Sequence, residues 1–245
     1  MAQPIKCQAF VETIVHHADG LATLNLKTIK KFPKIQPGQF IHLSLEDYDG
    51  IGFWPDSRAF SVANAVLDRQ TIRLTVSRQG DYTRRIISET KPGTQVWIKG
   101  PYGSFFVNDG EQRHKAVLIA GGTGVTPFCS YCDKILSSDD SIIQADVFYG
   151  AKREDLLIYK KLLDKCSAKF EHFNVNYFVE ESRSDRPQGL NIGSLNIREI
   201  VCSIGEVENR IFYISGPKLM ISNFKNILLK DFFVHEQNIK LDEWT

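Results

Sequence analysis

The sequence lacks an excess of charge of either sign and a long apolar run, and each absence excludes a class of protein. Lys and Arg number 30 against 29 Asp and Glu, a formal net charge of +1 over 245 residues, so nothing suggests a nucleic-acid binder. No apolar stretch approaches the roughly 20 residues of a membrane-spanning helix, and the first residues lack the apolar core of a signal peptide. We therefore expect a cytoplasmic protein with no membrane span.

Cysteines are few, and they are odd in number and scattered along the chain. None of the five shows zinc or iron–sulfur spacing, so we expect no metal and free thiols in a reducing compartment. Cys129 and Cys132 have the spacing of a redox pair. They fall in the first turns of a helix predicted after Pro127, where one face must be buried, and we expect them to be buried and chemically quiet.

The periodicity of the chain changes near residue 110. Up to there, short β-rich runs separated by Gly, Pro and Asp turns predict an antiparallel sandwich or barrel with one helix near 83–89. The predicted strands are 6–15, 21–26, 39–45, 58–63, 71–77 and 95–99. Beyond it, strands alternate with helices, which favours a mostly parallel, doubly wound sheet. The strands are expected at 115–120, 143–149, 173–179, 210–215 and 238–241, and the helices at 126–137, 153–166, 195–202 and 217–231. The expected domains are 1–111 and 112–245.

The most informative stretch runs from Val117 to Pro127. A short apolar run ends in Gly121-Gly122-Thr123-Gly124, and a helical pattern follows. Strand, glycine turn and helix N-terminus together form a seat for a nucleotide pyrophosphate. The fingerprint is imperfect, because proline replaces the third glycine and the next strand ends without an acidic residue for a ribose hydroxyl. A purely structural turn fits the local pattern equally well.

Two motifs in the first half are candidates for binding a phosphate and a ring system. On the predicted strand 58–63, Arg58 could pair with a phosphate, Phe60 stack on an aromatic ring and Ser61 donate a hydrogen bond. A surface arginine and a core phenylalanine explain this strand alone at least as well. Thr83, after Gly80, is either the N-cap of the following helix or part of a second anion seat.

These motifs occur in an order that closely resembles the ferredoxin–NADP reductase family, from about residue 5 to residue 244. The motifs are Arg58-x-Phe60-Ser61, Gly80-x-x-Thr83, Gly100-Pro101-x-Gly103-x-Phe105, Gly121-Gly122-Thr123-Gly124-x-Thr126-Pro127, Tyr149-Gly150-x-Lys152-x-x-Asp155-Leu156, Ser215-Gly216-Pro217-x-x-Met220 and a terminal Glu243-Trp244. Any one of these motifs is weak evidence, but their occurrence together in the right order is strong evidence.

The resemblance implies a six-stranded antiparallel β-barrel that binds FAD, followed by an α/β domain that binds NAD(P)H. In the barrel it assigns the FAD pyrophosphate, ribityl and isoalloxazine contacts to Arg58, Ala59, Phe60, Ser61, Ser77, Arg78, Gly80, Asp81, Tyr82 and Thr83. In the second domain it assigns coenzyme contacts to Thr123, Gly124, Thr126, Lys152, Ser182, Arg183, Gly216, Pro217 and Met220. Ser61, Ser215 and Trp244 would lie at the reacting rings, with Trp244 covering the flavin face that nicotinamide must reach.

The implied activity is hydride transfer between NAD(P)H and flavin, with electrons passed to a separate carrier such as ferredoxin or flavodoxin. A free-flavin reductase and an electron-transfer subunit of a larger complex are the alternatives, and a monomer is expected. Ser182 and Arg183 match a pair that NADP-using members employ, so the resemblance favours NADPH over NADH. Leu190-Asn191, in place of the family's glycine-basic pair, weakens that preference, and Ser215 stands where many members have cysteine.

Overall fold

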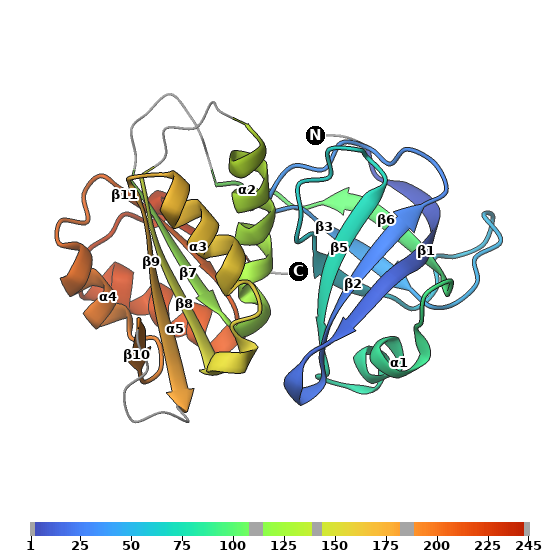
Figure 1. Cartoon of the computed structure of the whole chain (residues 1–245). Coiled ribbons are helices and arrows are strands. Elements are labelled where there is room, and N and C mark those ends of the chain that lie inside the picture. Colours follow the sequence, from blue (N-terminus) through green and yellow to red (C-terminus); the bar gives the residue numbers. More distant parts are fainter. Residues whose placement is uncertain (1–2, 108–114, 139–143, 182–188, 243–245) are drawn as a thin grey trace. The chain divides into compact units, whose positions relative to one another are not determined.

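The computed structural model describes residues 3–107, 115–138, 144–181 and 189–242 (Figure 1). The chain divides into two compact units. The first comprises Met1–Phe106 and Thr126–Lys134, and the second comprises Val107–Val125 and Ile135–Thr245. The expected boundary at 111/112 lies outside the described residues, so it stays a prediction.

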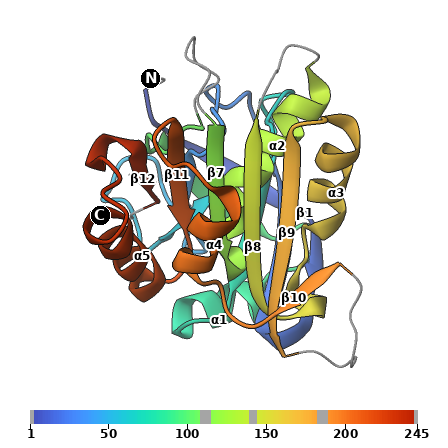
Figure 2. The ribbon, with the colours of Figure 1, turned by 90° about the vertical axis from the view of Figure 1, so that its left-hand side faces the viewer.

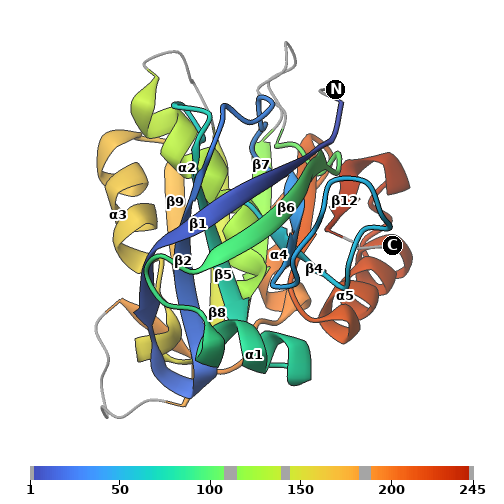
Figure 3. The same cartoon turned by 90° about the vertical axis from the view of Figure 1, so that its right-hand side faces the viewer.

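The first unit is a nearly closed antiparallel barrel of six strands in the order β4-β3-β6-β1-β2-β5. The strands are β1 (Ile5–His16), β2 (Leu21–Thr28), β3 (Phe40–Ser44), β4 (Arg58–Ser61), β5 (Thr71–Ser77) and β6 (Gln95–Tyr102). A bridge between Val62 and Leu74 connects the end of β4 to β5. Figure 3 shows β1, β2 and β6 curving round this unit. The antiparallel six-stranded fold is therefore confirmed.

Alternation of side chains along the strands builds the barrel core. On β2, the inward residues Ala22, Leu24 and Leu26 are fully buried, while the residues between them are half-buried. The helix α1 (Asp81–Glu89) follows β5 and places Tyr82 and Ile86 in the same core. The period-two pattern in the sequence thus has a direct structural cause, which is burial of one strand face.

The second unit is a six-stranded parallel sheet in the order β10-β9-β8-β7-β11-β12 (Figure 2). The strands are β7 (Lys115–Gly121), β8 (Ala145–Arg153), β9 (Phe173–Glu181), β10 (Leu190–Ile192), β11 (Arg210–Ser215) and β12 (Ile239–Leu241). Helices α4 (Ile197–Ile204) and α5 (Lys218–Lys230) cover one face, and α3 (Lys160–Lys169) lies on the other (Figures 1 and 2). The doubly wound α/β fold is confirmed.

The helix α2 (Thr126–Ser137) begins at the predicted position, immediately after a 3₁₀ turn over Gly122–Val125. Pro127 occupies its first turn, where a missing N–H costs nothing. On the central strand β7, residues 116–120 are buried, as expected for a strand covered on both faces.

The structure differs from the local predictions at three places. Strand β8 continues to Arg153 because residues 151 and 153 pair with β9, so α3 begins only at Lys160. Strand β10 was not predicted, since its three residues are ordered by pairing with β9. Thr83 is not an N-cap: Gly80 caps α1, and the Thr83 hydroxyl reaches back to accept the N–H groups of Gln79 and Gly80.

None of the five cysteines forms a disulfide, and four of them are buried. Cys129 and Cys132 are inaccessible to solvent, as are Cys7 and Cys166, whereas Cys202 is exposed. We expect a thiol-specific reagent to modify one cysteine per native chain quickly and all five after denaturation. Mass spectrometry should locate the fast label on Cys202, and fast labelling of Cys129 or Cys132 in the folded protein would favour a redox pair.

Among the described residues, no helix is both long and apolar enough to cross a membrane.

Candidate functional site

The glycine turn after β7 packs directly against the turn after β11. A Cβ placed on Gly124 would lie 2.4 Å from the carbonyl oxygen of Ser215 and 2.5 Å from the amide nitrogen of Gly216. Gly216 has a φ of +147° and approaches the backbone of Gly121, where its own Cβ would lie 3.0 Å from both N and O. Glycine is required at 124 and 216 because the two backbones are in contact.

A cavity of about 520 Å³ opens at the carboxyl ends of these strands, within the second unit. Ligands of open parallel sheets bind at this edge, and the volume is within the range of small-molecule and cofactor sites. The lining residues are Gly121, Gly122, Gly150, Ala151, Lys152, Glu180, Gly193, Ser194, Leu195, Pro217, Leu219, Met220, Asn223 and Phe224. The walls are therefore glycine-rich on the side of β7 and β8, and apolar along α5.

The residues expected to bind coenzyme fall into three groups in the structure. Lys152, Pro217 and Met220 line the cavity. Thr123, Gly124 and Gly216 lie in the two turns that meet beside it, and Thr126 is the buried first residue of α2. Ser182, Arg183 and Trp244 lie outside the described residues, so their assignments stay predictions.

Three polar residues that line the cavity were not predicted from the sequence: Glu180, Ser194 and Asn223. Glu180 is the penultimate residue of β9, and its carboxylate accepts a 3.1 Å hydrogen bond from the hydroxyl of Ser194. The neighbouring Glu181 lies 3.4 Å from the ammonium of Lys152. An acidic pair directly after a predicted buried strand was the available signal, because carboxyl ends of parallel strands form the ligand-binding edge.

Ser215 is buried at the end of β11 and donates a 2.8 Å hydrogen bond to the carboxylate of Asp242, which follows β12. Burial raises the pKa of Asp242 to about 6, and the hydrogen bond from Ser215 lowers it by less. Asp242 was not predicted as a site residue, although it directly precedes the terminal pair Glu243-Trp244. The Ser215–Asp242 contact holds the end of β12 beside the β11 turn.

The raised pKa of Asp242 predicts a pH-dependent stability. An unfolded Asp has a pKa near 3.9, whereas that of Asp242 in the folded protein is about 6, so the folded state binds the proton more tightly. The resulting contribution to the free energy of unfolding is fully present below about pH 4 and is lost as the pH rises through about 6. Above pH 6 we expect Asp242→Asn to have a free energy of unfolding about 1–3 kcal/mol higher than wild type, as measured by urea denaturation; the lower part of this range allows for the partial accessibility of Asp242. The difference should vanish near pH 4. A pH-independent difference would contradict this assignment.

In the first unit, Arg58 and the start of α1 come together at the surface of the barrel. The guanidinium of Arg58 lies 4.6 Å above the ring of Tyr82 in the first turn of α1, and it pairs with Asp56 at 2.6 Å. The Tyr82 hydroxyl donates to the carbonyl of Asp56 and accepts the amide of Leu45. The cationic side chain of Arg58 and the N-terminus of α1 therefore lie side by side. Both attract negative charge, so together they favour the binding of an anion.

The turn before α1 is open and ordered by Thr83. Apart from its chain neighbours, no heavy atom lies within 4 Å of a Cβ placed on Gly80, and the carboxylate of Asp81, 91% exposed, pairs with Arg84. The first-turn N–H groups of α1 have no intrahelical partner. An anion can therefore approach this turn closely.

The other residues assigned to flavin differ in exposure. Arg58 is exposed and Ala59 is half-buried, whereas Phe60 and Ser61 are buried, with Phe60 9% exposed in the barrel core. Ser77 is half-buried at the end of β5 and Arg78 is exposed beside Gly20. The structure thus brings Arg58 to α1, while ring stacking on Phe60, a largely buried side chain, stays a prediction.

Among the described residues, no group of three His, Cys, Asp or Glu side chains is placed to hold a metal ion.

Comparison with known proteins identifies relatives for most of the chain. Residues 118–226 match the oxidoreductase NAD-binding domain family. One subunit of the Na(+)-translocating NADH-quinone reductase of Neisseria meningitidis is 28% identical over 222 residues, covering 81% of this chain and 54% of the relative. The chloroplastic ferredoxin–NADP reductase leaf isozyme 1 of Oryza sativa subsp. indica is 27% identical over 215 residues, covering 78% and 59%.

A third relative is the reductase component of phenol 2-monooxygenase from Pseudomonas sp., 29% identical over 177 residues, with 71% of this chain and 48% of the relative covered. The chain spans about half the length of the curated relatives it matches. Among solved structures, the ferredoxin reductase in carbazole 1,9a-dioxygenase shares the fold over the whole chain and 70% of its own, with a TM-score of 0.78 at 21% identity. The FAD/NAD-binding domain of a Vibrio cholerae nitric oxide dioxygenase gives 0.78 at 18% identity, covering 96% and 97%.

Proposed function

We propose that the chain, whose residues 118–226 match the oxidoreductase NAD-binding domain family, is an FAD-containing reductase of the ferredoxin–NADP reductase type that takes a hydride from NAD(P)H and passes electrons to a separate carrier protein such as ferredoxin or flavodoxin. The observation that supports the proposal most strongly is the cavity at the carboxyl edge of the parallel sheet. Beside it, the glycine turns after β7 and β11 are in direct backbone contact. That is where a dinucleotide binds an open parallel sheet.

The residues of the first unit fit FAD in their chemistry. Arg58 and the N-terminus of α1 supply a planar cation and a set of N–H donors for one pyrophosphate. When bound, FAD supplies a ring that accepts hydride from nicotinamide and releases the electrons to the carrier. Ser61, with its hydroxyl near the end of β4, is the proposed hydrogen-bond partner of the ring edge.

In the second unit, the chain's own residues bind and orient the coenzyme. The turn over Gly122–Val125 receives the pyrophosphate, with Met220 and Pro217 packed at Gly121 beneath it. Ser215, held by Asp242, and Gly216 form the proposed nicotinamide end. Hydride transfer needs little acid–base chemistry, so orientation of the reactants is the main contribution of the protein.

The experiment that tests this function starts from the purified, desalted protein. We expect one FAD per chain, released on denaturation, and rapid reduction of the bound flavin by NADH or NADPH without oxygen. Reoxidation by ferredoxin or flavodoxin should be faster than by free FMN. Loss of flavin on desalting, together with turnover of added flavin, would instead favour a free-flavin reductase, and absence of reduction by both coenzymes would contradict the proposal.

A further inference from the structure

The loop between β3 and β4 carries two large apolar side chains that are fully open to solvent. Ile51 is 93% exposed and Phe53 is 102% exposed, more than any other large apolar side chain in the described part of the chain. Figure 1 shows this light-blue loop extending outward from the strands of the first unit. Removal of apolar surface from water is the main driving force of association, so these two side chains favour contact with another apolar surface.

Contacts at the base of the loop hold its tip in a defined shape. The carboxylate of Asp49 accepts the amides of Ile51 and Gly52, both at 2.9 Å. The hydroxyl of Tyr48 donates to the carbonyl of Gly52 at 3.3 Å, and the Tyr48 ring packs edge-on against Trp54 with ring centroids 5.6 Å apart. The tip is therefore preorganised, which lowers the conformational entropy that binding would cost.

Two lysines lie directly opposite each other beside this loop. In the antiparallel pairing of β1 with β6, Lys6 faces Lys99, and like charges in such a pair destabilise a sheet. Lys6 donates a hydrogen bond to the hydroxyl of Tyr48, and the ammonium of Lys99 is 5.9 Å from the ring centroid of Trp54. Over the residues that the structure describes, neither lysine forms a salt bridge. An external anion would relieve their repulsion.

Other ionisable groups near the two lysines are engaged by different partners. The amides of the tip are the main cause of the lowered pKa of Asp49, and Lys6 is the smallest cause. Asp47 accepts a 3.4 Å hydrogen bond from a glutamine amide on β6. His42 faces Lys99 across β3 and β6, and burial together with Lys99 lowers the pKa of His42, so this side chain is neutral at pH 7. An ammonium has three N–H donors, so both lysines keep donors for phosphate oxygens.

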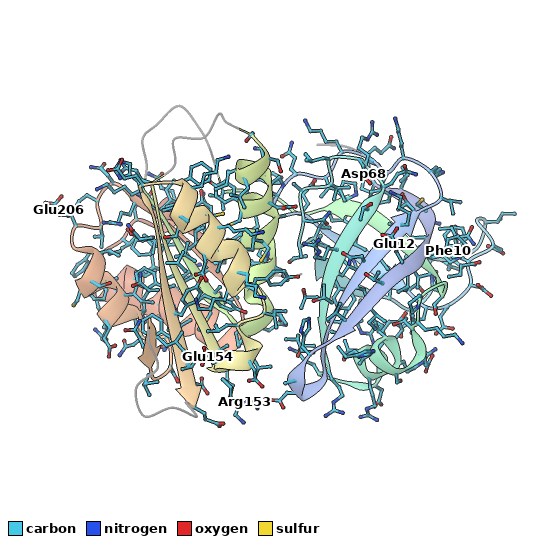
Figure 4. The ribbon with its side chains drawn as sticks, in the orientation of Figure 1. Phe10, Glu12, Asp68, Arg153, Glu154 and Glu206 are labelled. Carbon is cyan, nitrogen blue, oxygen red and sulfur yellow. The ribbon has the colours of Figure 1, made fainter. Side chains whose placement is uncertain are left out.

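The combination of features is typical of a site that binds the surface of a lipid bilayer. A free phosphate would explain the paired lysines but not the exposed tip, and a protein would need a pocket shaped to fit it, whereas a bilayer accepts any apolar projection. Trp and Tyr at the base, with lysines beside them, are the residues that favour the membrane interface. Phe10 shares a strand face with Lys6 and is 38% exposed at the outside of the barrel (Figure 4).

We propose that the tip of the β3–β4 loop, Ile51 and Phe53, inserts into the surface of a membrane that contains anionic lipids, while Lys6 and Lys99 bind the lipid phosphate groups. The reductase would thereby dock reversibly on the bilayer through its first unit. None of these four residues is assigned to FAD or to the coenzyme, so the inference stands apart from the proposed function.

The test is cosedimentation of the flavin-loaded protein with vesicles of phosphatidylcholine alone and of an equimolar mixture with phosphatidylglycerol. We expect at least about tenfold tighter binding to the mixed vesicles, because each lysine near an anionic surface contributes to affinity. The double variant Ile51→Ser/Phe53→Ser should bind both kinds of vesicle at least about tenfold more weakly. Lys6→Gln/Lys99→Gln should bind the two kinds equally.

Two variants of the same unit serve as matched controls. Leu67→Ser removes an apolar side chain that is 71% exposed elsewhere in the barrel unit, and Lys34→Gln/Lys91→Gln removes two exposed positive charges. Both should bind vesicles like wild type. FAD content and flavin reduction by coenzyme without vesicles should be unchanged in every variant, which shows that folding is intact.

Three results would overturn the inference. Absence of binding to either kind of vesicle would leave the tip as a contact for a protein. Wild-type binding by the Ile51→Ser/Phe53→Ser protein would show that the tip does not insert. Calorimetric binding of inorganic phosphate that is lost in Lys6→Gln/Lys99→Gln, without vesicle binding by the wild type, would identify a site for free phosphate instead.

Discussion

Replacing Gly124 with alanine is expected to disable coenzyme binding and to destabilise the second unit. The added Cβ would lie 2.4 Å from the Ser215 carbonyl oxygen and 2.5 Å from the Gly216 nitrogen, distances that neither backbone atom can accept without moving. Overpacking of this kind costs roughly 1–3 kcal/mol of unfolding free energy. A displacement of about 1 Å in a site that orients reactants lowers the rate about 100-fold, so kcat/KM for NAD(P)H should fall by that order.

Urea unfolding and flavin-reduction kinetics measure the two effects, and Gly52→Ala provides the control. Gly52 lies on a loop of the first unit, without a positive φ, and a Cβ there would have an ordinary 3.5 Å contact with Asp49. Such a substitution is neutral or slightly stabilising. If Gly124→Ala unfolded and turned over coenzyme like wild type, the close approach of the β7 and β11 turns would not be what positions the site.

Local pattern in the sequence was sufficient to predict most of this architecture. The apolar run from Val117 to Ala120 ends in glycines, and the structure has there a fully buried strand, a tight turn and a helix that begins at Thr126. Alternation along residues 21–26 predicted a half-buried strand, and burial on β2 follows it. A strand that is buried on one face alternates apolar and polar residues, and a strand that is buried on both faces is a continuous apolar run. These two patterns are the signals that made the predictions possible.

The features that escaped prediction depend on which remote segments meet. Lys152 and Arg153 are polar, and only pairing with β9 makes them strand residues. Glu180 and Ser194 are 14 residues apart and come together because the 193–194 segment returns beside β9. Asp242 acquires its raised pKa from burial beside Ser215, 27 positions away. The acidic pair after β9 could have drawn attention to Glu180, but nothing in the local sequence indicates which remote residue each of these side chains contacts.

The position of Arg58 shows the same limit in the barrel. Residues two apart on a strand normally share one face, but the short strand β4 exposes Arg58 and buries Phe60. What singles out Arg58 in the structure is its stacking on Tyr82, which belongs to a helix more than 20 residues later. The sequence predicted that Arg58 and the start of the helix after Gly80 both bind the pyrophosphate. In the structure, the contact between Arg58 and the ring of Tyr82 brings the two together.

Replacing Arg58 with alanine is expected to weaken FAD binding by about 1.5–3 kcal/mol, the range for hydrogen bonds to charged groups, which is about 10- to 150-fold in Kd. Folding should be little affected, because the Arg58 side chain is 47% exposed and its pair with Asp56 is at the surface. Asp56→Asn is expected to act in the opposite direction, since it removes the carboxylate that competes with a pyrophosphate for the same guanidinium.

Fluorescence titration of the apoprotein with FAD measures both changes, and Arg73→Ala is the control for loss of one positive charge in the same unit. Arg73 lies on β5, where it donates to Asn25, and no role in binding is assigned to it. The expected order of FAD affinity is Asp56→Asn above wild type, Arg73→Ala equal to it and Arg58→Ala well below. A folded Arg58→Ala protein with wild-type affinity would show that the pyrophosphate is bound elsewhere, and the first turn of α1 alone would then have to be tested as the anion seat.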